Sequence, residues 1–157
     1  MGGNYLTTAL TVILAGLLVT AAVTDLRSRI ISNKLNLAVA LLAPLFWFSM
    51  HWDPWPTMAI QVAQAVVVFA VFTAMFALGM MGGGDVKLLA AVALWPSFGD
   101  LVILIVLMSV IGGVVTLVTA IHHRMTKRLG RPEIPYGVAI SIAAFWVIPV
   151  LAWRTIS

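Results

Sequence analysis

The stretch MMGGGDVKLLA, from Met80 to Ala90, decides the fold. It ends a run without any charged residue that begins at Pro54, and it places Asp85 and Lys87 directly behind three glycines. An uncharged apolar run of this length is typical of a helix that crosses a bilayer. Asp85 is therefore predicted at the end of a membrane span. The presence of a carboxylate at this position calls for a structural or functional explanation.

The composition of the chain is that of a membrane protein. Hydrophobic residues make up 62% of the 157 residues and charged residues 9%, against about 45–50% and about 25% in soluble domains. No low-complexity tract, internal repeat or long polar linker interrupts the chain, so one polytopic domain is expected over residues 1–157. The absence of cysteine excludes disulfides, thiolate metal sites and cysteine nucleophiles.

The apolar runs predict an all-α membrane protein with six transmembrane helices. A span needs about 20 helical residues to cross a hydrocarbon core about 30 Å thick. The fourth run gives only about 18 Å of helix, so it crosses only if it begins at Asp85, if the bilayer thins, or if it is a half-helix in a protein-lined cavity. The predicted spans are Leu6–Thr24, Leu35–His51, Thr57–Met81, Leu88–Gly99, Leu101–Ile121 and Ile134–Trp153.

The basic residues predict the orientation of these spans. If both termini are periplasmic, the inner loops are Asp25–Lys34, Gly82–Lys87 and His122–Glu133, and they hold eight of the nine basic residues. This asymmetry is the one that the positive-inside rule describes. No basic residue precedes the first apolar run, which favours an uncleaved span over a signal peptide.

This topology gives Asp85 a partner. Asp25 ends the first span and Asp85 the third, both at the cytoplasmic edge, whereas Asp53, Asp100 and Glu133 fall in loops. Ionising both of two carboxylates in one site is unfavourable because their negative charges repel each other. Such a pair can therefore share a proton. This suits aspartic proteolysis, in which the ionised member deprotonates a water and the protonated member donates to the carbonyl oxygen. Alternatively, each aspartate balances a neighbouring cation as an interfacial anchor.

The three glycines before Asp85 have two interpretations. Gly82, Gly83 and Gly84 permit backbone conformations that a Cβ forbids, and they allow another backbone to approach closely. A substrate peptide could then lie extended beside Asp85. Alternatively, the glycines form only a flexible break between two helices.

Three blocks of the sequence resemble the type IV prepilin peptidases, which are GxGD-type aspartic peptidases. They are TDLRSRIISNKLN (24–36), GGGDVKLLAAVALW (82–95) and EIPYGVAISIAA (133–144), in the order of the family. The resemblance implies a multi-pass aspartic endopeptidase of the bacterial inner membrane that removes the short basic leader of prepilins on the cytoplasmic side. Its implied catalytic residues are Asp25 and Asp85, and its implied substrate-binding or supporting residues are Gly82, Gly83, Gly84, Lys87, Asn33, Tyr136 and Gly137.

The short, cysteine-free loops resemble the peptidase-only TadV/CpaA branch, which serves Flp-type pili. The partners then implied are Flp-type pilin and pseudopilin precursors and membrane lipid, with no nucleic acid, no cofactor, no metal and no methyltransferase domain. The competing function is a non-enzymatic assembly factor or transporter-like protein that uses the aspartates for proton or partner binding.

The first block departs from the family at one position. Ser32 stands where the common pattern Ile-Pro-Asn has proline, so the turn after Asp25 is expected to be looser. Asn33 is expected to bond the backbone near Asp25, and the alternative is that Ser32 or Asn33 starts a helix.

Overall fold

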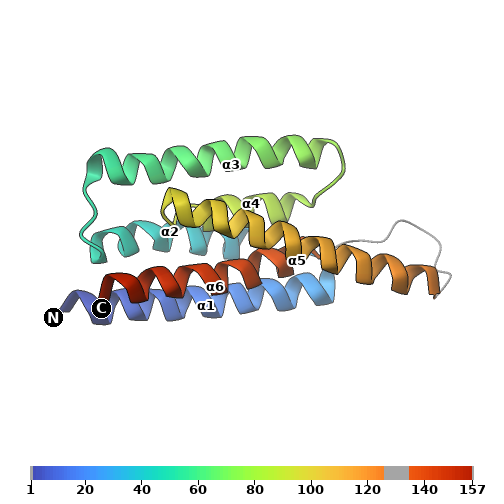
Figure 1. Cartoon of the computed structure of the whole chain (residues 1–157), viewed down its shortest axis with the longest axis horizontal. Coiled ribbons are helices and arrows are strands. Elements are labelled where there is room, and N and C mark those ends of the chain that lie inside the picture. The colour runs from blue at the N-terminus through green and yellow to red at the C-terminus, as the bar shows by residue number, and fades with distance from the viewer. Residues whose placement is uncertain (1, 126–134, 157) are drawn as a thin grey trace.

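The computed structural model describes residues 2–125 and 135–156, which form six α-helices and contain no strand (Figure 1). The all-α fold is therefore confirmed. Three helical stretches in this part of the chain, Tyr5–Ser28, Pro54–Ala77 and Phe98–Ile121, are long and apolar enough to cross a bilayer. The helices are α1 (Gly2–Ser28), α2 (Asn33–Ser49), α3 (Ala59–Ala77), α4 (Gly83–Val92), α5 (Phe98–Met125) and α6 (Tyr136–Ile156), with a short irregular turn, η1 (Pro54–Met58), before α3.

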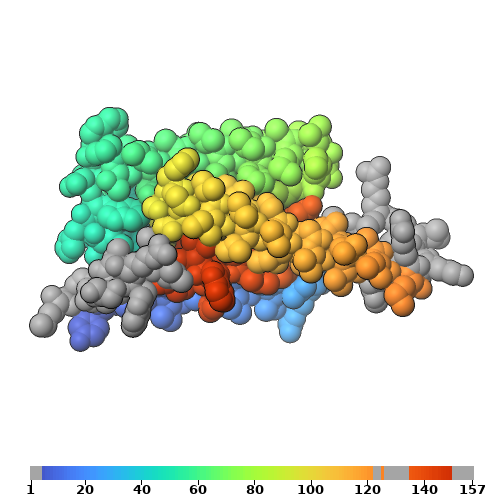
Figure 2. All heavy atoms as spheres, in the orientation of Figure 1, coloured from blue at the N-terminus to red at the C-terminus, as the bar shows by residue number. Residues whose placement is uncertain are grey.

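The short helix α4 lies in the middle of the bundle. It packs against α2, α3 and α6, while α1 packs against α2 and α6. Figure 1 shows α1 and α6 side by side, with α3 as the outermost helix on the opposite side of α4. In the space-filling view, α5 crosses the face of α6 (Figure 2). The element with the least apolar length is thus the one most surrounded by protein.

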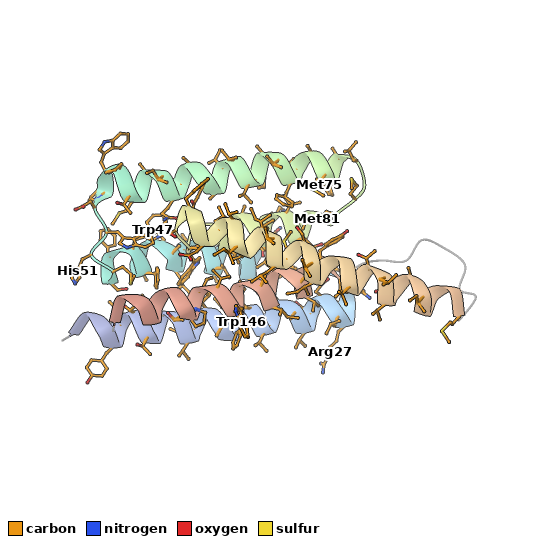
Figure 3. All side chains as sticks on the ribbon, in the orientation of Figure 1. Arg27, Trp47, His51, Met75, Met81 and Trp146 are labelled. Carbon is orange, nitrogen blue, oxygen red and sulfur yellow. The ribbon has the colours of Figure 1, made fainter. Side chains whose placement is uncertain are left out.

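The outer surface of the bundle is apolar, as the composition predicts. Large hydrophobic side chains such as Leu41, Val66 and Val110 are more than 60% exposed, and Trp146 points away from the helices (Figure 3). Helices that are apolar on all sides are typical of membrane spans. The bundle therefore offers lipid a surface as hydrophobic as its core.

The boundaries of α4 differ from those predicted. The sequence predicts a segment over 88–99, whereas the helix begins at Gly83 and ends after ten residues at Val92, a length of about 15 Å. Gly82 precedes it in an extended conformation, with φ −74° and ψ 145°. Gly83 and Gly84 are therefore part of the helix, whereas Gly82 is the last residue of the break between α3 and α4.

Buried side chains explain how α4 can end early. The indole of Trp47 donates to the carbonyl oxygen of Leu94 over 2.8 Å, and Gln64 Nε2 donates to those of Ala93 and Pro96 over 2.8 and 2.9 Å. Without water in the hydrocarbon region, unpaired carbonyl groups would each cost several kcal/mol. Protein donors therefore satisfy the carbonyl groups at the end of α4, as the half-helix alternative requires.

The turn between α1 and α2 keeps a proline-like backbone without proline. Ser32 has φ −69°, close to the value of about −65° that a proline ring fixes. Its side chain accepts a hydrogen bond from the backbone N–H of Leu35 over 3.2 Å. The alternative that Ser32 starts a helix is confirmed, and the expected departure from the proline-type turn is not seen in the backbone.

Candidate active site

The structure brings Asp25 and Asp85 together. Asp25 lies in the last turn of α1 and Asp85 in the first turn of α4. Their side chains are 4% and 7% exposed, and the two carboxylates interact electrostatically. The pair that the sequence singles out by its position at span ends is thus a pair in space.

The beginning of α6 holds this pair. The backbone N–H of Val138 donates to Asp25 Oδ2 over 3.2 Å. The backbone N–H of Gly137 interacts with both carboxylates, Asp25 and Asp85. A helix start carries a partial positive charge of about +0.5 and unpaired N–H groups, which favour a negative group beside it. The two carboxylates therefore share one fixed backbone donor, the N–H of Gly137.

Glycine is the only residue type that fits at position 137, at the start of α6. A Cβ at this position would lie 2.8 Å from Asp25 Oδ2 and 2.5 Å from Ile31 Cδ1. Both distances are shorter than those of real Cβ contacts. The absence of a side chain at Gly137 lets the Asp25 carboxylate reach the backbone N–H groups.

The glycines before Asp85 provide space and not an unusual backbone. A Cβ on Gly82 would lie 2.8 Å from Asp85 Oδ2, and one on Gly84 would lie 3.3 Å from both Cβ and O of Ile31. Gly83 would meet only the end of the Phe76 ring, at 3.4 Å. None of the three has a positive φ. The expected use of glycine-specific conformations is thus wrong, and the expected close approach is seen.

A cleft of about 220 Å³ lies beside Asp85. It is lined by Arg29, Ile30 and Ile31 from the turn after α1, and by Gly82–Asp85. Arg29 has a positive φ of 56° and interacts electrostatically with both carboxylates. Arg27, two residues earlier, points away from the bundle (Figure 3). Sequence reasoning counted Arg29 only among the inner-loop cations, because its backbone conformation leaves no mark in the sequence.

Lys87 and Asn33 lie together, on the other side of α4. Lys87 Nζ donates to Asn33 Oδ1 over 2.9 Å, and Lys87 is about 200° around the helix from Asp85. The expected bond from Asn33 to backbone near Asp25 is therefore wrong. Asn36, which sequence reasoning missed, makes the comparable contact by donating from Nδ2 to the carbonyl oxygen of Gly84 over 3.2 Å.

Tyr136 lies apart from the cleft. Tyr136 is half-buried, and its ring packs against Gly112 of α5, where a Cβ would lie 3.6 Å from it. His51 lies at the end of the bundle opposite Arg27 (Figure 3). The side chains of His122 and His123 are outside the described residues, and the described ones hold no group of three His, Cys, Asp or Glu that could bind a metal.

One comparison with known proteins identifies the family. Residues 12–117 match the model of the type IV leader peptidase family. No curated protein and no solved structure gives a significant match. The matched segment contains both Asp25 and Asp85 and ends within α5, before the helix start that holds the pair. Because the match covers more than half of the sequence, this chain belongs to the type IV leader peptidase family.

Proposed function

We propose that this protein is an aspartic endopeptidase that removes the leader of Flp-type prepilins at the cytoplasmic edge of the bacterial inner membrane. The observation that carries the proposal is the pair of buried carboxylates beside one backbone N–H, that of Gly137. Two separate anchors would each have a cation of its own, whereas Arg29 interacts electrostatically with both carboxylates. Lys87 instead bonds Asn33, on the far side of α4 from Asp85.

The chemistry follows from the pair. The ionised carboxylate takes a proton from a water as the water oxygen attacks the scissile carbonyl carbon, and the protonated carboxyl donates to the carbonyl oxygen. The tetrahedral intermediate collapses when the C–N bond breaks and the leaving amine takes up a proton. The fixed N–H groups of Gly137 and Val138 hold a carboxylate without reorganisation during these steps. Arg29 offsets part of the negative charge.

The cleft supplies a route for the peptide. Gly82–Gly84 line it without side chains beyond hydrogen, so an extended main chain can lie close to Asp85. The cleft is at the end of the bundle where α1 ends and α2, α4 and α6 begin. A bond at the end of an apolar helix can thus reach the carboxylates while the helix stays in the bilayer.

The proposed topology has six crossings with both termini outside and the carboxylates at the inner edge. It is supported by the eight of nine basic residues that then face the cytoplasm. Because the chain has no cysteine, single cysteines can test it. Arg27→Cys should resist a membrane-impermeant thiol reagent in intact cells, whereas Trp55→Cys, at a side chain that is 80% exposed, should react. The reverse pattern would contradict the topology.

The test of the proposed function is a cleavage assay. Purified protein is incubated with a Flp-type prepilin, and the product is identified by its mass. Asp25→Asn and Asp85→Asn should each abolish leader removal, since an amide of nearly the same shape cannot act as a general base or share the proton. Asp53→Asn is the matched control, because Asp53 is exposed and its side chain makes no capping bond. Substantial cleavage by either variant of the pair would rule out the aspartic mechanism.

A further inference from the structure

A second, larger hollow lies on the side of α4 that faces away from the carboxylates. It is a groove of about 580 Å³ between α2, α3 and α4. Lys87, Ala90 and Ala91 line it from one face of α4, and Leu94 lines it just after the helix. This face is about half a turn from Asp85. A molecule in this groove would therefore be separated from the cleft by the helix itself.

The groove is polar at one end only. Its polar lining residues, Asn33, Asn36 and Lys87, belong to the first turns of α2 and α4, and every other residue that lines it is apolar. Among the described residues, no carboxylate lines it. The ammonium of Lys87 has three donors, and the hydrogen bond to Asn33 occupies one. The groove thus suits a ligand with an anionic head and a hydrocarbon tail.

We propose that this groove binds one phospholipid with an anionic headgroup, its phosphate at Lys87 and an acyl chain along α3 and α4. From Lys87 of α4 to Leu94, just beyond the end of the helix, the lining extends over about 10 Å, which fits within the about 15 Å of hydrocarbon in a single leaflet. A lipid of one leaflet matches this depth, and a membrane-spanning helix of a substrate does not.

The lipid would also support the first turn of α4, which carries Asp85. Asn36 lines the groove and is 5% exposed. Its Nδ2 donates to the carbonyl oxygen of Gly84, the residue before Asp85. A ligand packed against Asn36 therefore stabilises the start of α4 from the side that faces away from the carboxylates. The binding itself does not depend on the proposed peptidase activity.

Lipid retention can be measured without a cleavage assay. The protein is delipidated in a neutral detergent and mixed with phosphatidylglycerol or with zwitterionic phosphatidylcholine of the same chains, and the bound lipid is counted by native mass spectrometry. We expect one retained phosphatidylglycerol, with a preference of at least fivefold over phosphatidylcholine. Equal retention of the two lipids would overturn the proposal.

Two pairs of variants locate the lipid. Ala90→Phe fills the groove and should reduce phosphatidylglycerol retention at least tenfold, whereas Ala70→Phe, at an exposed position of α3 outside the groove, should not. Lys87→Gln should remove the preference for the anionic lipid, and Lys34→Gln, an exposed lysine that does not line the groove, should keep it. Wild-type retention by Ala90→Phe, or an unchanged preference in Lys87→Gln, would refute the assignment.

A competition experiment separates lipid from substrate. A synthetic peptide with the apolar helix of a prepilin should leave the bound phosphatidylglycerol in place. Displacement of the lipid by this peptide would overturn the proposal and make the groove part of the substrate site.

Discussion

Gly137→Ala tests whether the start of α6 is built around the Asp25 carboxylate. Helix propensity alone favours alanine over glycine by up to about 1 kcal/mol. The structure predicts the opposite result, because the added methyl group would lie 2.8 Å from Asp25 Oδ2, 3.0 Å from its Cγ and 2.5 Å from Ile31 Cδ1. Either the carboxylate or the beginning of α6 must move.

The size of the effect follows from what that movement disrupts. Overpacking costs about 1–3 kcal/mol, and the hydrogen bond from Val138 to the Asp25 carboxylate is of a kind that contributes about 1.5–3 kcal/mol. A catalytic group misplaced by about 1 Å lowers the rate by about 100-fold. We therefore expect kcat/KM for leader removal to fall by about 100-fold or more, and the free energy of unfolding to fall by about 1–3 kcal/mol.

The assay combines prepilin cleavage, measured by product mass, with thermal unfolding followed by tryptophan fluorescence. Gly113→Ala is the matched control, because a Cβ at this position of α5 has no atom within 4 Å. It should keep wild-type kcat/KM and equal or higher stability. A Gly137→Ala variant with wild-type kcat/KM would refute the role given to the start of α6.

Four further substitutions test other parts of the fold. Gly82→Ala places a methyl group 2.8 Å from Asp85 Oδ2 and should abolish cleavage, whereas Gly83→Ala meets only a ring at 3.4 Å and should keep most of it; equal activities would contradict this. Gln64→Leu leaves two carbonyl groups at the end of α4 without their donor. Each unpaired carbonyl group should lower the free energy of unfolding by about 1–3 kcal/mol. An unchanged unfolding midpoint would contradict the half-helix argument. Ser32→Pro exchanges a capping bond of about 1 kcal/mol for a stiffer unfolded chain, so its unfolding free energy should stay within about 1 kcal/mol of the wild-type value.

The helices and the carboxylate pair could be predicted from the sequence because only a few charged residues interrupt the apolar runs. These residues mark the ends of the helices. Asp25 and Asp85 are the acids that follow long apolar runs and lie on the same side in the predicted topology. The extent of α4 could not be predicted in this way. Its end depends on donors from Trp47 and Gln64, which are about 30 to 50 residues away in the chain. A half-helix and a thin span leave the same pattern of apolar residues.

The contacts around the pair were harder to predict than the pair itself. The segment Asn33–Asn36 has an asparagine at each end, one helical turn apart, and only the packing of α2 on α4 decides which of them meets the loop before Asp85. The structure assigns this contact to Asn36 and leaves Asn33 with Lys87. Arg29 meets the carboxylates through a backbone conformation with φ 56°, which tertiary packing selects against local preference.

The surroundings of the pair favour hydrolysis over the competing role in proton or partner binding. A proton relay through a membrane needs further titratable groups that accept the proton in turn. Among the described residues, Asp100 bonds the hydroxyl of Ser97 over 2.6 Å at the start of α5, and His51 lies at the opposite end of the bundle (Figure 3). The donors at Gly137 and Val138 are backbone groups, which cannot turn away to release a carboxylate to a new partner. Two carboxylates beside fixed donors, with Asp85 lining a cleft, suit a reaction that takes its water and returns its products through that cleft.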